Sequence, residues 1–267
     1  MKSWRQLVPL LILAGMSCAA TEPPSPLDET VARAEHHAAA FLDVFSEVKC
    51  TEYVDQFKLN PNGKVEYKTR SRFDYLVIAQ TSDGELNLEE SRLEEQAGAH
   101  KENEPLLVTN GFATLLLVFH PYYRNAFEFS AAGDDVLDGR PVAKIRFRHI
   151  RGQRTPTVLM LRGREYPLEM MGTAWIDRET GAVERIESEL QVGMEDIGLR
   201  TLHSQVSYAP VKFRGMTESP WLPKEATIEV ATPRQRWRNT HHFENYQHFG
   251  VETEHKEDPS NTLSKSR

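Results

Sequence analysis

The side chains that could bind a metal ion or transfer a proton are present, but their spacing does not bring them together. Ten histidines occur in the chain. His241 and His242 are adjacent, so on a strand they face opposite ways. His242 and His248 share a strand face but lie ~20 Å apart at ~3.3 Å per residue, too far for one ion bound at ~2 Å. His36 and His37 diverge on a helix. The spacing therefore predicts no metal site.

The acidic residues and the cysteines give no catalytic arrangement either. The pairs Asp134/Asp135 and Glu195/Asp196 could act as acid and base, but side by side in turns they are typical of solvated carboxylates. Cys50 has no neighbouring signature and fits a small buried apolar residue. The sequence contains no nucleophile elbow, phosphate loop, dinucleotide fingerprint or His-Glu-x-x-His. We therefore expect a protein that is not an enzyme and carries no cofactor.

The charge of the chain argues against nucleic acid as a partner. The formal net charge is −7 at neutral pH, whereas nucleic-acid-binding domains are basic. One basic run interrupts the acidic background, with no acid between its members. It can form a patch for anionic lipid headgroups, or pair with the acidic stretch 85–95 or with solvent. Its members are Arg140, Lys144, Arg146, Arg148, Arg151, Arg154, Arg162 and Arg164.

The first twenty residues predict export. Lys2 and Arg5 precede an apolar run at 7–14, which is shorter than the ~20 residues that span a bilayer. We interpret residues 1–20 as a signal peptide and 21–26 as a Pro-rich spacer. Either Cys18 is lipidated, as in a bacterial lipoprotein, or the leader is removed just after it. The protein is then periplasmic or anchored to the outer membrane, and only lipidation of Cys18 would attach it to a membrane.

The elements that must position any site are mostly strands. Residues 172–188 read as a hairpin around the turn 177–181, because Asp and Gly favour such turns. Further runs with a period of two lie on both sides of it. A helix begins at Ser25 and Pro26 and carries an apolar stripe over 31–48. A second run, 112–119, is apolar all round and predicts a buried helix, or a buried strand.

This order predicts a mainly β (α+β) fold. No strand–helix–strand alternation indicates a parallel sheet. A large antiparallel sheet that curls over the N-terminal helix and the second apolar helix explains the pattern, because wide sheets curl to manage their edges. The stretch 252–267 is polar and is expected to be a disordered tail.

Two motifs carry a family resemblance. Trp175-Ile-Asp-Arg-Glu-Thr-Gly-Ala-Val-Glu-Arg185 and Val136-Leu-Asp-Gly-Arg-Pro-Val-Ala-Lys-Ile-Arg146 resemble strands of the LolA/LolB-like superfamily of periplasmic lipoprotein carriers. The likeness is closer to uncharacterised exported relatives than to LolA itself. It implies a half-open β-barrel over residues 27–251 with helices on its concave face.

The resemblance also implies a function. A barrel of this kind would bind an acyl chain, a lipoprotein or a similar hydrophobic ligand in its concavity. We expect the ligand to be lined by Phe41, Phe45, Phe112, Leu115, Leu116, Phe119 and Trp175. The alternative is an envelope-associated interaction or sensor module of the same fold, which docks on a protein partner and carries nothing.

Overall fold

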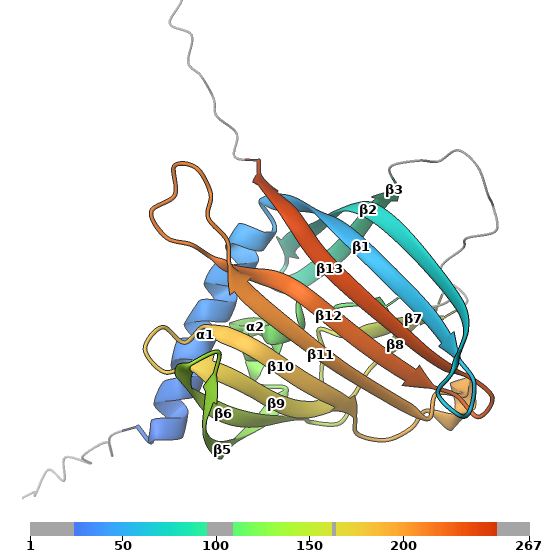
Figure 1. Cartoon of the computed structure of the whole chain (residues 1–267). Coiled ribbons are helices and arrows are strands. Elements are labelled where there is room, and N and C mark those ends of the chain that lie inside the picture. Colours follow the sequence, from blue (N-terminus) through green and yellow to red (C-terminus); the bar gives the residue numbers. More distant parts are fainter. Residues whose placement is uncertain (1–23, 95–108, 162–163, 250–267) are drawn as a thin grey trace, which may run out of the picture.

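The fold was analysed in a computed structural model of the chain. It describes residues 24–94, 109–161 and 164–249 (Figure 1). The signal peptide with Cys18, most of the spacer and the C-terminal tail lie outside these residues, so those expectations stay predictions. None of the described helices has both the length and the apolar character needed to cross a membrane.

One antiparallel sheet of ten strands dominates the molecule. Its order is β3-β2-β1-β13-β12-β11-β10-β9-β6-β5, and its two outermost strands do not pair with each other, so the sheet curls but stays open (Figure 1). The predicted fold class is therefore confirmed. The strands are β1 Val48–Leu59, β2 Val65–Ser82, β3 Glu85–Glu94, β5 Phe127–Leu137, β6 Arg140–His149, β9 Met170–Asp177, β10 Val183–Leu190, β11 Thr201–Pro210, β12 Trp221–Ala231 and β13 Arg236–His248.

The remaining elements are short. A small second sheet contains β4 (Thr109–Asn110), β7 (Val158–Leu161) and β8 (Arg164–Pro167), in the order β4-β7-β8. A 3₁₀ turn, η2 (Glu195–Ile197), lies between β10 and β11.

The predicted hairpin is formed by β9 and β10, and its turn rests on a helix. The Asp177 carboxylate accepts hydrogen bonds from the backbone N–H groups of Glu179 and Thr180, at 3.0 and 2.8 Å. Gly181 has a φ of +75°, and a Cβ there would lie 2.5 Å from the backbone carbonyl of Arg33. Only glycine fits this conformation and this approach. The turn therefore fixes the hairpin against the N-terminal helix.

That helix, α1, spans Pro26–Phe45 and covers the inner face of the sheet. Ser25 and Asp28 form a reciprocal capping box, which satisfies N–H groups at the helix start. Its apolar stripe is buried, and the rings of Phe41 and Phe45 pack 4.9 Å apart. The expected amphipathic helix is thus present and packs on the sheet.

The second apolar run lies on the same face of the sheet but is not a regular α-helix. Leu115–Phe119 form a 3₁₀ helix, η1, and Pro121–Arg124 form a single α-turn, α2. His120 separates them with an extended backbone, and its Nδ1 accepts from the N–H of Tyr122. Extended backbone is what a residue before proline prefers. Pro121 therefore ends the first helix, as expected, and begins the next.

One histidine of α1 should make the stability depend on pH. Burial lowers the pKa of His37 to about 4, with a smaller contribution from His36. Between pH 6.5 and 4 the unfolded chain then binds more protons at this position than the folded chain. The free energy of unfolding must fall as the pH falls through this window, by up to about 1.4 kcal/mol per unit of pKa difference.

We expect His37→Gln to flatten this dependence, measured as melting temperature between pH 7.5 and 4.5. His36→Gln is the matched control, since His36 is adjacent and exposed. Identical pH profiles for wild type and His37→Gln would show that other groups cause the loss of stability at acidic pH.

Candidate functional site

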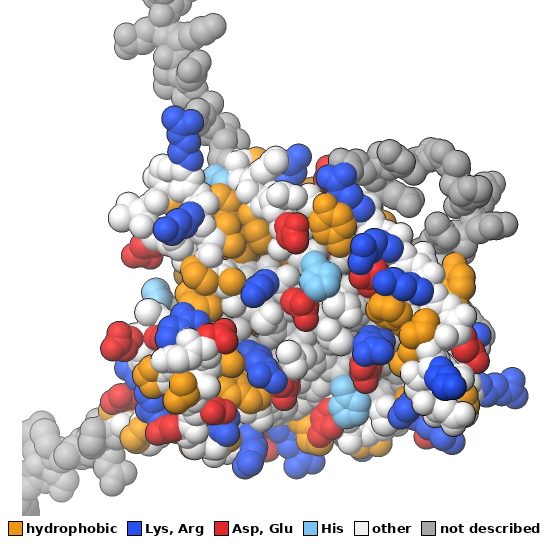
Figure 2. Space-filling model, in the orientation of Figure 1, with side chains coloured by type: hydrophobic (Ala, Val, Ile, Leu, Met, Phe, Trp, Pro, Cys, Tyr) orange, Lys and Arg blue, Asp and Glu red, His pale blue; other side chains and the backbone are white. Residues whose placement is uncertain are grey.

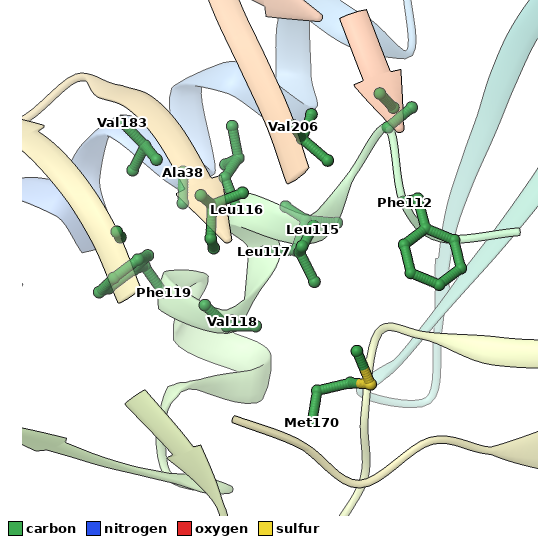
Figure 3. Close-up of a cluster of buried hydrophobic side chains, with 14 of the residues drawn as sticks. Ala38, Phe112, Leu115, Leu116, Leu117, Val118, Phe119, Met170, Val183 and Val206 are labelled. Carbon is green, nitrogen blue, oxygen red and sulfur yellow. The ribbon is translucent and has the colours of Figure 1, made fainter. Parts of the chain in front are cut away.

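Residues 109–124, containing β4, η1 and α2, form a segment that we call the plug. Its 3₁₀ helix lies between α1 and the sheet, among side chains such as Ala38, Val183 and Val206 (Figure 3). All five residues of η1 are buried, with exposed fractions of 0–1%. A segment that is apolar on every side is thus covered on every side.

The plug and α1 bring together six of the seven predicted ligand-lining residues. Phe41 and Phe45 come from α1, and all six belong to one buried apolar cluster. The four others come from the plug, namely Phe112, Leu115, Leu116 and Phe119. Sequence reasoning therefore identified a real cluster, whose role in ligand binding stays a prediction.

Trp175 lies apart from these six residues. On β9 it alternates with the buried Ala174 and Ile176, so it faces the outer side of the sheet. There its Nε1 donates to Asp135 at 3.0 Å, and the Arg185 guanidinium lies 4.8 Å from the centre of its ring. The structure gives this side chain a surface contact rather than a place near the plug.

The apolar interior of the described residues is closely filled. A small gap beside Arg92, Phe112 and Phe243 has no room for a water molecule. Two hollows, of about 570 and 510 Å³, lie instead on the outer side of the sheet and have mixed polar and apolar linings that include Thr173 and Glu189. Figure 2 shows this outer side, with mixed charges around a hollowed centre.

Beside the plug, the inner face of the sheet carries a buried charge cluster. Glu52 of β1 is completely buried, and its carboxylate accepts from Arg92 Nε at 2.6 Å and Nη2 at 3.1 Å. His241 Nδ1 lies 2.8 Å from the same carboxylate. Arg92 also forms an ion pair with Glu90 at 3.0 Å and lies over the ring of Tyr75. The cluster joins β1, β3 and β13.

The neighbours of these groups keep them charged despite burial. Burial alone would raise the pKa of Glu52, but the hydrogen bond from His241 and the charge of Arg92 outweigh it, and the pKa is lowered. Burial likewise opposes the charged form of Arg92, yet Glu52 and Glu90 raise the pKa of Arg92 above its ordinary value. Charges in an apolar interior persist only when paired in this way.

The charge cluster also holds the start of the plug. Arg92 Nη1 donates to the Asn110 side-chain oxygen at 3.0 Å, and the N–H of Gly111 donates to Glu90 Oε1 at 2.5 Å. Further along, the Tyr208 hydroxyl accepts from the N–H of Leu116 at 3.2 Å and donates to the carbonyl of Ala113 at 3.3 Å.

Side chains anchor the far end of the plug as well. The Tyr122 hydroxyl donates to Glu85 at the start of β3, and Arg124 forms an ion pair with Glu35 of α1 at 3.2 Å. Among the described residues, side chains thus make the hydrogen bonds that join the plug to the ten-stranded sheet.

Sequence reasoning missed the residues that hold the plug. Glu52 had a usable signal, because it shares a strand face with Cys50 and Val54 and so had to be buried or paired. No such signal existed for Arg92 and Tyr208, because their partners Glu52 and Ala113 are 40 and 95 residues away in the chain. The buried Cys50 behaves as expected, because burial, with a smaller effect of Glu52, raises the pKa of its thiol to about 12.

Four members of the basic run pair with carboxylates of the fold, and one of these carboxylates, Glu85, belongs to the acidic stretch considered above. Arg162 lies outside the described residues. The pairs are Arg140–Glu184 at 2.7 Å, Lys144–Asp135 at 3.5 Å, Arg151–Glu169 at 4.0 Å and Arg154–Glu85 at 3.5 Å. Over the part of the chain that the structure describes, no three acidic, histidine or cysteine side chains are grouped so as to hold a metal ion.

Comparison with known proteins gives structural likeness only. No family model matches the chain, and no curated protein matches it. Among solved structures, a DUF1329 family protein from Desulfovibrio piger is 11% identical, with a TM-score of 0.43 over 82% of this chain and 93% of that one.

A LolA superfamily protein from Nitrosomonas europaea is 10% identical, with a TM-score of 0.41 over 83% and 94% of the two chains. A domain from Vibrio parahaemolyticus, named for outer membrane lipoprotein sorting, is 11% identical, with a TM-score of 0.40 over 85% and 94%. The second of these three belongs to the superfamily that the two sequence motifs resemble. At such identities and TM-scores, function has to be argued from the chain's own residues.

The charge cluster makes a testable contribution to stability. Arg92→Met leaves two buried carboxylates without their guanidinium, and we expect a loss of roughly 3–5 kcal/mol in the free energy of unfolding by urea. Arg70→Met is the control, because Arg70 pairs with Asp55 at 2.7 Å but is largely exposed on the outer face. Its effect should be much smaller. Equal losses in the two variants would mean that the cluster is not a buried network.

Proposed function

We propose that this chain is an exported, non-enzymatic binding protein that holds an acyl chain or a similar hydrophobic group in its half-barrel, in the space that the plug now fills. The observation that carries the proposal is the plug itself. The side chains of η1 offer only apolar surface to α1 and the sheet, as an acyl chain would, and the plug adds no strand to the large sheet.

The energetics of such an exchange support the proposal. Apolar burial contributes about 25 cal/mol per Å² and has no directional requirement, so a ligand can recover much of what the five side chains of η1 lose on leaving. A 3₁₀ helix has poorer hydrogen-bond geometry than an α-helix and is uncommon in long runs. The backbone hydrogen bonding of η1 therefore opposes movement less than that of helix α1 does.

The alternative is an interaction module of the same fold, and one observation favours it. The two hollows described above lie on the outer side of the sheet, whereas the gap beside Arg92 in the apolar interior has no room for a water molecule. A protein partner docked on that outer side would need no movement of the plug. A binding test on plug variants separates the two functions.

Weakening the plug should strengthen ligand binding. Leu116→Ala removes buried contacts that exist only while the plug is in place, at a cost of about 2–5 kcal/mol. The open state becomes more populated, and apparent affinity rises with that population. We expect at least a tenfold lower apparent Kd for the neutral probe N-phenyl-1-naphthylamine, measured by fluorescence titration.

Leu202→Ala is the matched control, since Leu202 is fully buried on β11 and lies outside the plug. It should lower the melting temperature similarly without improving probe binding. If neither the wild type nor either variant binds the probe, the result would favour the interaction-module function over the binding-protein function.

Export can be tested on the protein from its native host. The basic residues Lys2 and Arg5 and the apolar run 7–14 motivate the expectation. Mass spectrometry of the mature N-terminus should find either a lipid-modified Cys18, or a free start at Ala20 or Thr21. Retention of Met1 on the mature protein would contradict export.

A further inference from the structure

Movement of the plug would expose two specific hydrogen-bonding positions, and this inference rests on the proposed function. With Asn110 and Gly111 gone, Arg92 Nη1 loses an acceptor at 3.0 Å and Glu90 Oε1 loses a donor at 2.5 Å. Both side chains are only partly accessible, with exposed fractions of 18% and 6%. Buried polar groups left without partners cost about 1–3 kcal/mol each. A ligand that restores both bonds would avoid this cost.

The two plug groups together have the chemistry of an amide. Asn110 offers a carbonyl-type oxygen and Gly111 offers an N–H, and both meet residues of one strand, β3. A primary or secondary amide presents the same acceptor and donor side by side. A carboxylate presents acceptors alone, so it could satisfy Arg92 but not Glu90.

The charge of the cluster adds to this selection. Two carboxylates, those of Glu52 and Glu90, already face the single guanidinium of Arg92. The guanidinium is already engaged by both carboxylates. A carboxylate or phosphate head would bring a further negative charge into a poorly hydrated site, where like charges repel strongly.

A third polar group, on β2, lies beside Arg92. The Tyr75 hydroxyl is fully buried and has no hydrogen-bond partner among the described residues. Tyr75 lies opposite Arg92 in the β2–β3 register, and its ring lies 5.0 Å from the Arg92 guanidinium. Buried hydroxyls are normally paired. A polar group of a ligand beside Arg92 would give this hydroxyl a partner.

We infer that Arg92, Glu90 and Tyr75 form a head-group subsite that selects amphiphiles with a neutral, amide-type head over those with an anionic head. The apolar tail of such a ligand takes the place of η1. Phe112 and Phe243, which line the small gap beside Arg92, flank the junction between head and tail.

The test compares two amphiphiles with the same tail. Oleamide and oleate, both below their aggregation concentrations at pH 8, compete for bound N-phenyl-1-naphthylamine. We expect oleamide to displace the probe at a concentration at least tenfold lower than oleate. Equal potency, or stronger displacement by oleate, would overturn the subsite while the proposed function stands. A wild type that binds neither probe nor amphiphile would overturn the proposed function itself, and the subsite with it.

The variant Glu90→Gln tests directly whether the charge of the Glu90 carboxylate selects against anionic heads. Glutamine keeps an acceptor for the ligand N–H but removes one negative charge. The apparent affinity for oleate should therefore rise about tenfold, and that for oleamide should change little. Glu89→Gln is the control, because Glu89 is exposed on the same strand. This variant should keep the wild-type ratio of the oleamide and oleate affinities. Circular dichroism checks that both variants fold. A ratio unchanged by Glu90→Gln in a folded protein would overturn the role of this carboxylate.

Discussion

The inner face of the ten-stranded sheet must be kept from water, and most of the structure follows from that requirement. A two-layer protein buries an apolar sheet face against helices. Here α1 covers part of it, and the plug covers what α1 leaves open. The hairpin turn at Gly181 approaches α1 so closely that no other residue fits. The sheet therefore contacts α1 through its hairpin turn as well as through its inner face.

The two parts of the cover are held differently. Helix α1 has its own capping box and an internal backbone ladder, so it is stable as an element once packed. The plug has little regular structure, and side chains such as Arg92 and Tyr208 hold its backbone to the sheet. Glu52 in turn holds Arg92, and His241 lies against the same Glu52 carboxylate. The position of a short apolar segment thus depends on charges that are themselves buried and paired.

The sequence predicted the architecture because its signals are local. Alternation showed that Ile176 and Trp175 face opposite ways, and the cap at Ser25 located α1. The apolar run around Leu116 was correctly expected to be buried, but its 3₁₀ form depends on Pro121 and on long-range bonds. Arg92 could not be identified, because its partners come from distant strands. Trp175 was grouped with the ligand-lining residues although its alternation with Ile176 already placed it on the outer face.

Within the described residues β3 and β5 are the two edge strands of the open sheet, and both discourage other chains from adding a strand. At β5 the register shifts between Ala131 and Asp134, and Gly133 has a φ of +91°, which bends the strand away from a straight edge. At β3 the edge carries the exposed acids Glu85 and Glu89. Bulges and edge charges are how natural sheets avoid edge-to-edge aggregation. An unclosed sheet can in this way keep its edge strands from pairing with strands of other chains.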